Sequence, residues 1–474
     1  MKHEIIIVWF RRDLRVLDNP AFHAAAAQAK ILPIYIFDQD LKSEHAIGDG
    51  SKWWLHHSLQ SLQGSLDGSL RCYIGDAVKI LPKLAKEYKV TAVHFNKSYD
   101  SVEMKRDHAV ELELQKSDIE VKMFDESLLF SPSDILKKDG TPYKVFTPFY
   151  RECLKGPEPR IPLPKPRNIE FFTTKVDKHS IESLQLLEDN SVENRFEKHW
   201  KPGELSAHKR LQSFIKNGLE NYAQGRDFPA LKNVSRLSAH IHFGEISAHQ
   251  IWHEVKQNGH EYANKKNISC LLKELGWREF SYYVLYHNPT MYHKNLQEKF
   301  DRFAWRYSKK DLLAWQTGMT GYPIVDASMR ELFTTGYMHN RMRMVVASFL
   351  VKNLMIDWRT GAQWFWQLLV DADLASNSFN WQWVAGCGYD AAPYFRIFNP
   401  ITQAKKFDPA GEYIAQFVPE LSKLPSKYIA APWLAPEQVL KKAGIEMGVD
   451  YPMPIIDLKE SRDRALGSFK ALKK

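Results

Sequence analysis

Residues 371–400 read DADLASNSFNWQWVAGCGYDAAPYFRIFNP, and this is the most informative stretch of the chain. Asp371 and Asp373 stand two positions apart, and Trp381 and Trp383 flank a single glutamine. The carboxylates can accept hydrogen bonds from a ring N–H or pair with an arginine. Side chains two positions apart point in different directions, so we expect one indole to point inward and the other outward. The residues alone leave two interpretations open: a ligand site, or a helix cap followed by core aromatics.

The overall composition is that of a large globular protein with a moderate excess of basic residues. A chain of 474 residues is long enough for two or three domains. The formal net charge of +9 is compatible with binding to a phosphate backbone, and equally with an ordinary basic enzyme. The 14 tryptophans are roughly twice the number that average usage predicts. Composition does not decide whether they fill cores, stack on ligands or carry electrons.

Membrane, secreted and zinc-binding proteins are disfavoured as classes. No stretch approaches the roughly twenty apolar residues that a membrane span needs. The N-terminus, MKHEIIIVWF, runs into an apolar segment without a small-residue cleavage site. The four cysteines are too far apart in sequence to form a CxxC or Cys/His cluster: Cys72, Cys153, Cys270 and Cys387. We therefore expect a cytoplasmic protein with no metal site and no disulfide framework.

The first third of the chain has the pattern of an α/β domain. Short, nearly continuous apolar runs predict buried parallel strands at residues 5–10, 31–37, 71–74 and 92–95. Helical patterns lie between them, at residues 53–66 and 77–88. Strand and helix alternating at this spacing predict a doubly wound parallel sheet. No GxGxxG fingerprint follows the first run, so we do not expect a standard dinucleotide site there.

The remainder of the chain has a different pattern. Residues 156–167, GPEPRIPLPKPR, contain prolines that lack the N–H donors of a helix or a central strand. A polar stretch follows, and residues 135–205 are interpreted as a long connector. From residue 206 onward apolar residues recur at helical spacing, for example over 345–354 and 361–369. This half is therefore predicted to be all-helical.

Several segments resemble, in order, the motifs of the photolyase/cryptochrome family. They are WFRRDLR at 9–15 with Asp18 and Asn19, KVFTPF at 144–149, SRLS at 235–238, ELGWREF at 274–280, TGYPIVDA at 320–327, MHNRMRM at 338–344 and the stretch 371–400. The resemblance covers essentially the whole chain and is closest to the cyclobutane-dimer photolyases. It implies an α/β antenna domain at 1–134, a connector at 135–205 and a helical FAD-binding domain at 206–474. It also implies a monomer without an obligate protein partner.

The resemblance places an FAD site on thirteen residues. They are Tyr222, Val234, Ser235, Arg236, Leu237, Ser238, Arg278, Asn340, Arg343, Asp371, Ala372, Asp373 and Asn377. Hydroxyls, backbone amides and Arg236 suit a pyrophosphate. Val234 stands where the family often has threonine, so only a backbone contact is expected there. Arg343 and Asp371 are expected to form a buried ion pair, and Asn377 to face flavin N5 as a neutral amide.

The resemblance also implies a DNA site and an electron relay. The expected pocket for the pyrimidine dimer consists of Glu274, Trp277, Met344 and Trp383, in which the indoles stack on the flipped bases and Glu274 hydrogen-bonds the thymine edge. The residues expected to contact DNA around the pocket are Arg226, Arg341, Arg396 and Gln403. The tryptophans expected to reduce FAD from the surface inward are Trp305, Trp358 and Trp381. Trp315, Trp364 and Trp366 are interpreted as core residues.

A second chromophore is expected in the N-terminal domain. His45 and Glu103 align with contacts to a folate antenna, which predicts methenyltetrahydrofolate. Trp53 and Trp54 lie in a segment like those of folate-binding relatives, where an indole can stack on a pterin. The alternative interpretation is that they begin an amphipathic helix. Val102 stands where some relatives carry a folate-contacting asparagine. An 8-hydroxy-5-deazaflavin, a flavin or no antenna remain as alternatives.

The implied activity is light-driven splitting of cyclobutane pyrimidine dimers in UV-damaged DNA, a carbon–carbon lyase reaction in which excited, reduced FAD lends one electron. A cryptochrome-type photoreceptor is the main alternative, and it is disfavoured because Asn377 and Trp383 are both present and the chain stops soon after the helical domain. Repair of (6-4) photoproducts needs two histidines where this chain has Asn340 and Met344. A generic nucleic-acid binder fits the charge but leaves the flavin motifs unexplained.

Overall fold

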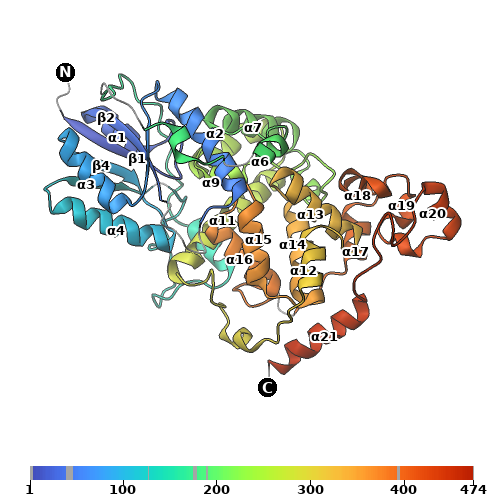
Figure 1. Ribbon diagram of the computed structural model, residues 1–474. Coiled ribbons are helices and arrows are strands. Elements are labelled where there is room, and N and C mark those ends of the chain that lie inside the picture. Colours follow the sequence, from blue (N-terminus) through green and yellow to red (C-terminus); the bar gives the residue numbers. More distant parts are fainter. Residues whose placement is uncertain are drawn as a thin grey trace. The chain divides into compact units, whose positions relative to one another are not determined.

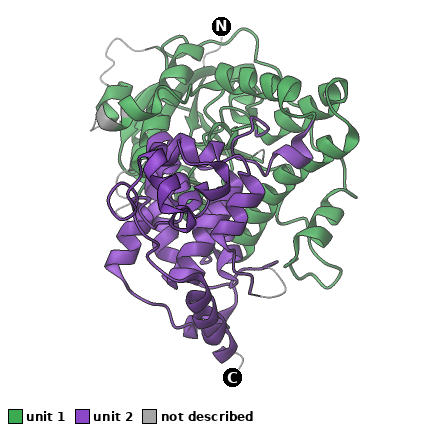
Figure 2. Cartoon of the chain, turned by 90° about the vertical axis from the view of Figure 1, so that its right-hand side faces the viewer, with its two compact units in different colours: residues 1–220, 235–289, 370–375 green, residues 221–234, 290–369, 376–474 purple. Residues whose placement is uncertain are grey.

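The computed structural model describes residues 4–38, 46–125, 127–173, 179–187, 190–391 and 395–472. The chain forms two compact units (Figures 1 and 2). Unit 1 comprises residues 1–220, 235–289 and 370–375, and unit 2 comprises residues 221–234, 290–369 and 376–474. Unit 1 therefore extends past residue 205, the end expected for the connector, and includes short segments of the helical half.

A five-stranded parallel sheet forms the N-terminal part of unit 1, in the order β3-β2-β1-β4-β5. Its strands are β1 Ile5–Phe10, β2 Lys30–Phe37, β3 Arg71–Ile74, β4 Ala92–Asn96 and β5 Glu120–Phe124. The four expected strands and the doubly wound class are confirmed. β5 is missing from the prediction because this edge strand mixes charged and apolar residues and none of its side chains is fully buried.

Helices account for most of the rest of unit 1. They are α1 Pro20–Gln28, α2 Asp49–Ser65, α3 Ala77–Tyr88, α4 Ser101–Gln115, α5 Phe146–Cys153, α6 Asn190–Phe196, α7 Glu204–Asn217, α9 Ser238–His242, α10 Ala248–Asn258 and α11 Lys265–His287, with 3-10 turns at Ile181–Leu184 and Gly259–Glu261. The two helices predicted in the first third correspond to α2 and α3. The expected connector contains α5 and α6, so it is not a structureless link.

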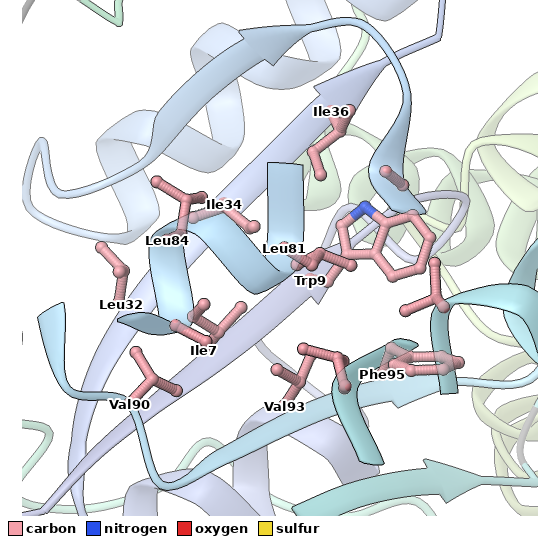
Figure 3. Close-up of a cluster of buried hydrophobic side chains, with 14 of the residues drawn as sticks. Ile7, Trp9, Leu32, Ile34, Ile36, Leu81, Leu84, Val90, Val93 and Phe95 are labelled. Atoms are coloured by element: carbon pink, nitrogen blue, oxygen red, sulfur yellow. The ribbon is translucent and has the colours of Figure 1, made fainter. Parts of the chain in front are cut away.

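The core of the α/β part lies on both faces of the sheet. On one face Ile7 and Trp9 pack with buried side chains of α3 and α4, as Figure 3 shows. On the other face Phe10 contacts Phe22 of α1, with ring centroids 5.9 Å apart. Successive residues of β1 alternate between the faces, and a parallel sheet covered on both sides needs apolar residues at both. This explains why β1 is a continuous apolar run.

Unit 2 is helical. Its helices are α8 Tyr222–Gly225, α12 Lys309–Gln316, α13 Pro323–Thr335, α14 Asn340–Ser348, α15 Trp358–Leu368, α16 Leu374–Ala385 (which begins in unit 1), α17 Pro400–Phe407, α18 Glu412–Phe417, α19 Ser426–Ile429, α20 Glu437–Ala443 and α21 Leu458–Ala471, with 3-10 turns at Glu298–Arg302, Pro419–Leu421 and Pro432–Leu434. Among the described residues beyond 205, the only strand-like pairing is an isolated bridge between Met447 and Tyr451. The all-helical prediction is confirmed.

The helix expected over residues 345–354 changes character midway. α14 is followed directly by a π-helix, Phe349–Leu354, which ends at Met355 in the left-handed region with a φ of 56°. π-helical turns are rare and often lie near functional sites. Here three residues separate the π-helix from α15, the helix that begins with Trp358.

Candidate functional site

The residues expected to hold FAD are divided between the two units. Unit 1 carries Ser235, Arg236, Leu237, Ser238, Arg278, Asp371, Ala372 and Asp373. Unit 2 carries Tyr222, Val234, Asn340, Arg343 and Asn377. The expected Arg343–Asp371 ion pair joins residues of different units and stays a prediction.

Asp373 is the centre of a buried polar cluster in unit 1. Its carboxylate accepts hydrogen bonds from the hydroxyl of Tyr282 and, at 3.4 Å, from Nδ1 of His242. Burial opposes the negative charge, but the hydrogen bond and charge of His242, with the charge of Arg12, hold the pKa of Asp373 below its ordinary range. Burial and the neighbouring carboxylate raise the pKa of Tyr282, so its hydroxyl keeps the proton that it donates. The cluster therefore maintains a fixed, ionised carboxylate.

Arg278 lies beside this cluster on α11. Its guanidinium is 4.9 Å from the ring centroid of Tyr282, and Nη1 donates to the carboxylate of Glu279 at 2.8 Å. The other oxygen of Glu279 accepts the backbone N–H groups of Leu129, at 2.6 Å, and Phe130, at 3.3 Å. Glu279 thus ties α11 to the last residues of the expected antenna domain and holds Arg278 in place.

The segment 235–238 makes a tight turn before α9. Arg236 has a φ of 53°, in the left-handed region that non-glycine residues seldom occupy. The hydroxyl of Ser235 accepts the N–H of Leu237 at 3.4 Å, and the Arg236 guanidinium lies 4.5 Å from the centroid of the Trp200 ring. Ser238 is exposed at the first position of α9. The turn thus carries two hydroxyl-bearing residues and an arginine within four consecutive positions, and these are groups that can bind a phosphate.

Glu274 and Trp277 lie three residues apart on α11 and therefore share a face of that helix. The Trp277 ring stacks on Phe146 of α5, with centroids 3.8 Å apart and planes 12° apart. Both Glu274 and Trp277 are half-buried. One face of the indole is thus supported by the protein while part of the ring is open to solvent, which is the geometry of a stacking platform.

In unit 2, α14 carries four of the expected site residues: Asn340, Arg341, Arg343 and Met344. Nη2 of Arg341 pairs with the Asp227 carboxylate at 2.7 Å, and Nη1 lies 3.6 Å from the sulfur of Met344. Nε of Arg343 donates to the carbonyl of Met338 at 2.8 Å. The structure therefore brings Arg341, expected to contact DNA, next to Met344, expected in the dimer pocket.

The other expected FAD residues on α8 and α14 are Tyr222, which is buried, and Asn340, which is exposed. Tyr222 is buried and carries the Arg226 guanidinium 5.6 Å from its ring centroid. Asn340 is exposed at the first position of α14, whose N-cap is His339. Burial, together with nearby arginines, lowers the pKa of His339 to about 4, so this cap is neutral near pH 7.

On α16, Asn377, Trp381 and Trp383 of the stretch 371–400 differ in their contacts and in their exposure to solvent. Nδ2 of Asn377 donates to the Ala362 carbonyl of α15 at 3.0 Å. Trp381 is buried, whereas Trp383 is half-buried and its Nε1 donates to the Asp390 carbonyl at 2.8 Å. One indole thus faces the core and one is open to solvent, which confirms the expectation from their spacing.

Trp381 packs directly on α15. A Cβ atom at Gly361 would lie only 2.2 Å from Cη2 of Trp381, so the indole needs the bare backbone at this position. Gly361 is three residues beyond Trp358, which starts the same helix and is completely buried. The structure therefore places Trp381 within one helical turn of Trp358 along α15.

Trp305 lies on a loop that returns to the same region. The backbone N–H of the next residue, Arg306, donates to the carbonyl of Met355 at 2.7 Å, three residues before Trp358. The Trp305 ring is half-buried and contacts Phe303, with centroids 4.5 Å apart. The three expected relay tryptophans thus belong to one region of unit 2, with the outermost partly exposed and the other two buried.

Arg396 lies in the segment that leads into α17, and Gln403 lies on α17 itself. The Arg396 side chain is exposed, and its carbonyl accepts a hydrogen bond from the buried ammonium of Lys352 in the π-helix. Burial lowers the pKa of Lys352 to about 7. Gln403 is half-buried on α17. Lys352 is a residue that no sequence motif predicts, because its role depends on a contact 44 positions away.

The structure bears differently on the residues that were expected to contact an antenna chromophore. His45 lies outside the described residues. Trp53 and Trp54 are 1% and 0% exposed, and Nε1 of Trp54 donates to Glu245 at 3.0 Å. The expectation that one of these indoles stacks on a pterin is corrected, because the chain's own side chains already cover both rings. They are core residues of α2.

Glu103 borders a cleft in unit 1, at the carboxyl ends of β1 and β4. These two strands are the topological switch point of the sheet, where doubly wound folds bind ligands. Arg12, at 3.3 Å, pairs with the Glu103 carboxylate, and Arg278 and Tyr282 also line the cleft. Burial would raise the pKa of Glu103, but Arg12, Arg106 and Arg11 lower it to about 2.

Among the residues that the structure describes, no three His, Cys, Asp or Glu side chains gather as metal ligands. Every helix described is too short or too polar to span a lipid bilayer.

Comparison with known proteins gives matches along the whole chain. Residues 6–167 match the family model described as DNA photolyase, and residues 271–471 match that of the FAD binding domain of DNA photolyase. The chain is 45% identical to the deoxyribodipyrimidine photo-lyase of Agrobacterium fabrum, over 100% of this chain and 99% of that protein. It is 38% identical to cryptochrome-1 of Arabidopsis thaliana, over 97% of this chain and 69% of that protein.

Among solved structures, a bacterial class III photolyase from Agrobacterium tumefaciens is similar with a TM-score of 0.96. The sequence identity is 44%, and the match covers 100% of this chain and 98% of that chain.

Proposed function

The chain belongs to the DNA photolyase family, and from this premise we propose that it splits cyclobutane pyrimidine dimers in DNA by light-driven electron transfer. Its C-terminal half is the FAD-binding domain of that family. The observation that carries the proposal is α16, which fixes the Asn377 amide against α15 and presents a half-buried Trp383 on the same helix. The first is suited to a reduced flavin and the second to an unstacked pyrimidine.

The chemistry of the expected donor set fits FAD. Ser235, Ser238 and Arg236 supply hydroxyls and a cation for a pyrophosphate. Asp373 supplies an ionised carboxylate that can accept a hydrogen bond from a ring N–H or from a ribityl O–H. Arg278 supplies a nearby cation. When bound, FAD supplies light absorption and the transferable electron. The chain's residues bind it, orient it and fix the surrounding charge.

Asn377 positions a neutral amide rather than an acid. Because its Nδ2 is already engaged with the Ala362 carbonyl, the orientation of the amide is set by α15. An amide has no acidic proton near neutral pH, so Asn377 cannot protonate an electron-rich ring beside it. An electron-donating ring beside Asn377 therefore keeps its negative charge, because the amide does not protonate it.

Dimer binding is assigned to Glu274, Trp277, Met344 and Trp383. Photolyases are among the enzymes that flip their target out of the duplex, and the flipped bases lose their stacking partners. The Trp277 ring, supported from behind by Phe146, and the half-buried Trp383 ring offer replacement surfaces. Glu274 supplies a hydrogen-bonding group for the thymine edge and for the charge that develops there.

Phosphate contacts are assigned to Arg226, Arg341, Arg396 and Gln403. Arg396 is exposed, and Arg226 and Arg341 are half-buried, so their charges are near solvent. Guanidinium groups match phosphate oxygens in charge and geometry. Each such contact releases counterions, and binding is therefore expected to weaken as salt rises.

Electron supply is assigned to Trp305, Trp358 and Trp381. Buried indoles carry the charge only transiently, since a low dielectric disfavours a cation. Trp305 is half-buried and so is the ring at which a positive charge is best solvated. This difference in burial supports a relay in which the positive charge moves from Trp381 outward to Trp305, while electrons move inward.

We further assign methenyltetrahydrofolate as the antenna, with Glu103 and His45 as contacts. Glu103 supports this because it is ionised, half-buried and lines the cleft at the switch point of the sheet. An 8-hydroxy-5-deazaflavin or a flavin in the same domain is the alternative. The absorption spectrum of purified protein distinguishes them, since each chromophore adds its own band to that of FAD.

A monomer in the cytoplasm is the assembly and location that we propose. Light scattering on purified protein tests the first: a mass near 55.1 kDa is expected for one chain. A mass twice as large would contradict it.

The decisive experiment is repair in vitro. DNA containing a defined thymine dimer is incubated with FAD-loaded, chemically reduced protein and exposed to blue or near-UV light. We expect loss of dimers in the light and none in the dark, measured by chromatography of the digested DNA. Unchanged dimers under illumination, with bound and reduced FAD confirmed by absorbance, would refute the proposed function.

A further inference from the structure

The indole of Trp358, the middle member of the assigned relay, makes one well-defined polar contact. The ring is 0% exposed, and its Nε1–H donates to Oδ1 of Asn295 at 2.9 Å. Asn295 is itself only 7% exposed. The amide therefore serves the indole and not the solvent.

A carboxylate behind Asn295 sets the orientation of that amide. Nδ2 of Asn295 donates to Oδ1 of Asp301 at 2.6 Å. A carboxylate can only accept, so the NH₂ end of the amide must point to Asp301 and the oxygen must point to Trp358. If the amide were reversed, two N–H groups would face each other at the indole and two acceptors would face each other at Asp301.

The charge around the ring is also arranged. The guanidinium of Arg359 lies 4.8 Å from the centroid of the Trp358 ring. It is held by Asp357, at 3.0 Å, and by the His293 carbonyl, which accepts from Nε at 2.6 Å. A cation over the face of an indole attracts its electrons and disfavours a second positive charge on the ring. Trp358 is thus an unfavourable place for a positive charge to remain.

A tryptophan that gives up one electron becomes a radical cation, and its N–H becomes far more acidic than in neutral indole. The group that accepts the hydrogen bond from this N–H then decides whether the radical cation loses its proton. A carboxylate would accept the proton and leave a neutral radical, which cannot pass the charge on. An amide oxygen is a much weaker base than a carboxylate and leaves the proton in place.

We propose that Asn295 is a positioning residue of the relay, because its oxygen holds the Trp358 N–H on an acceptor that does not take the proton. The inference rests on the proposed function, since it presupposes that Trp358 carries the charge. One electron passes from Trp358 to the oxidised Trp381, and one from Trp305 to the oxidised Trp358. No proton leaves Trp358 in either step, and a soluble thiol finally reduces Trp305.

The sharpest test exchanges the two groups. N295D/D301N places the carboxylate against the indole and the amide behind it, with the same atoms at the other positions and almost the same volume. Purified, FAD-loaded protein is excited by a short flash, and transient absorption separates the radical cation of tryptophan from the neutral radical. FAD content and the midpoint of thermal unfolding verify that the variant is folded.

The parent chain is expected to show the radical cation first, with its decay accelerated by added thiol as Trp305 is reduced. In N295D/D301N we expect the neutral radical to form early and its decay to become insensitive to thiol, because the buried Trp358 is not accessible. A folded variant with the spectra and thiol response of the parent would overturn the inference.

A second background separates this inference from the relay assignment. W305F removes the outer tryptophan, so the charge should stop at Trp358 and return rapidly to the flavin side. If W305F leaves the lifetime of the radical unchanged, the relay assignment itself fails. If W305F shortens the lifetime but W305F/N295D/D301N still shows only the radical cation, the relay stands and the role of Asn295 is refuted.

Discussion

Two pairs of tryptophans, Trp53 with Trp54 and Trp381 with Trp383, differ in how far their rings are buried. Trp53 and Trp54 of α2, in unit 1, are both covered by aromatic rings of the same unit, including Phe196 and Trp200. In α16 of unit 2, one indole is buried and the other is half-buried. The residue type is the same in both pairs, and the difference is in what already covers each ring.

Burial distinguishes the roles of these tryptophans only in part. A ring with no open face cannot stack on a ligand, which excludes Trp53 and Trp54 from a pterin site. Burial does not exclude electron transfer, because an electron needs proximity and not contact with solvent. Trp381 is as deeply buried as a core residue and yet is assigned to the relay, so only a functional measurement can distinguish it from a core tryptophan.

The largest effect is expected from Trp381→Phe. The phenyl ring fills most of the same space but is much harder to oxidise than an indole, so light-driven reduction of bound FAD should be lost. Absorbance of the oxidised flavin under blue light, with a thiol present, measures the rate. Trp315→Phe is the matched control, since Trp315 is fully buried and its ring centroid is 6.3 Å from that of Trp381. Equal rates in the two variants would remove the distinction between relay and core.

The next largest effect is on stability. Trp54→Ala should lower the free energy of unfolding by about 3–5 kcal/mol, because it leaves a large cavity and deprives the buried Glu245 of a hydrogen-bond donor. Trp383→Ala should cost only about 1–2 kcal/mol, since its ring is half-open already. Urea unfolding followed by circular dichroism provides both values. Similar losses for the two variants would contradict the contrast between the pairs.

A smaller effect is expected on substrate affinity. Trp383→Ala or Trp277→Ala should weaken binding of dimer-containing DNA by about 1–3 kcal/mol, the usual contribution of a stacked base. FAD affinity and the affinity for undamaged DNA should change much less, and both serve as internal controls in a fluorescence titration. If FAD were lost in proportion to DNA, the two indoles would belong to the flavin site and not to the dimer pocket.

Local patterns predict much of this fold but little of the site's geometry. The four apolar runs predict their strands because a parallel sheet buried on both faces needs continuous apolar residues, and β5 is missed because it is a half-buried edge. The Tyr282–Asp373 and Trp358–Asn295 contacts join residues 91 and 63 positions apart. No periodicity encodes such pairs, since they exist only once the helices have packed.

The family motifs supply the residue types of the site but not the reason why they work. The SRLS and MHNRMRM segments indicate an FAD site, yet neither shows that Asp373 is kept ionised by His242 and Arg12. The role of Gly361 is likewise invisible in the sequence, because a helical glycine is informative only when a neighbouring indole is seen to occupy its missing side chain.

The smallest expected effect concerns Arg341, whose charge is only half available. Its guanidinium pairs with Asp227 at 2.7 Å, so a phosphate must compete with a carboxylate that is already in place. Arg341→Ala should lower the slope of log affinity against log salt by about one, and should do so equally for damaged and undamaged DNA, because a phosphate contact carries no information about the base. Asp227→Asn is the complementary variant: it frees the guanidinium and should strengthen binding of both DNAs at low salt. If Arg341→Ala left the salt dependence unchanged while Asp227→Asn weakened binding, the ion pair would be structural and Arg341 would not contact DNA.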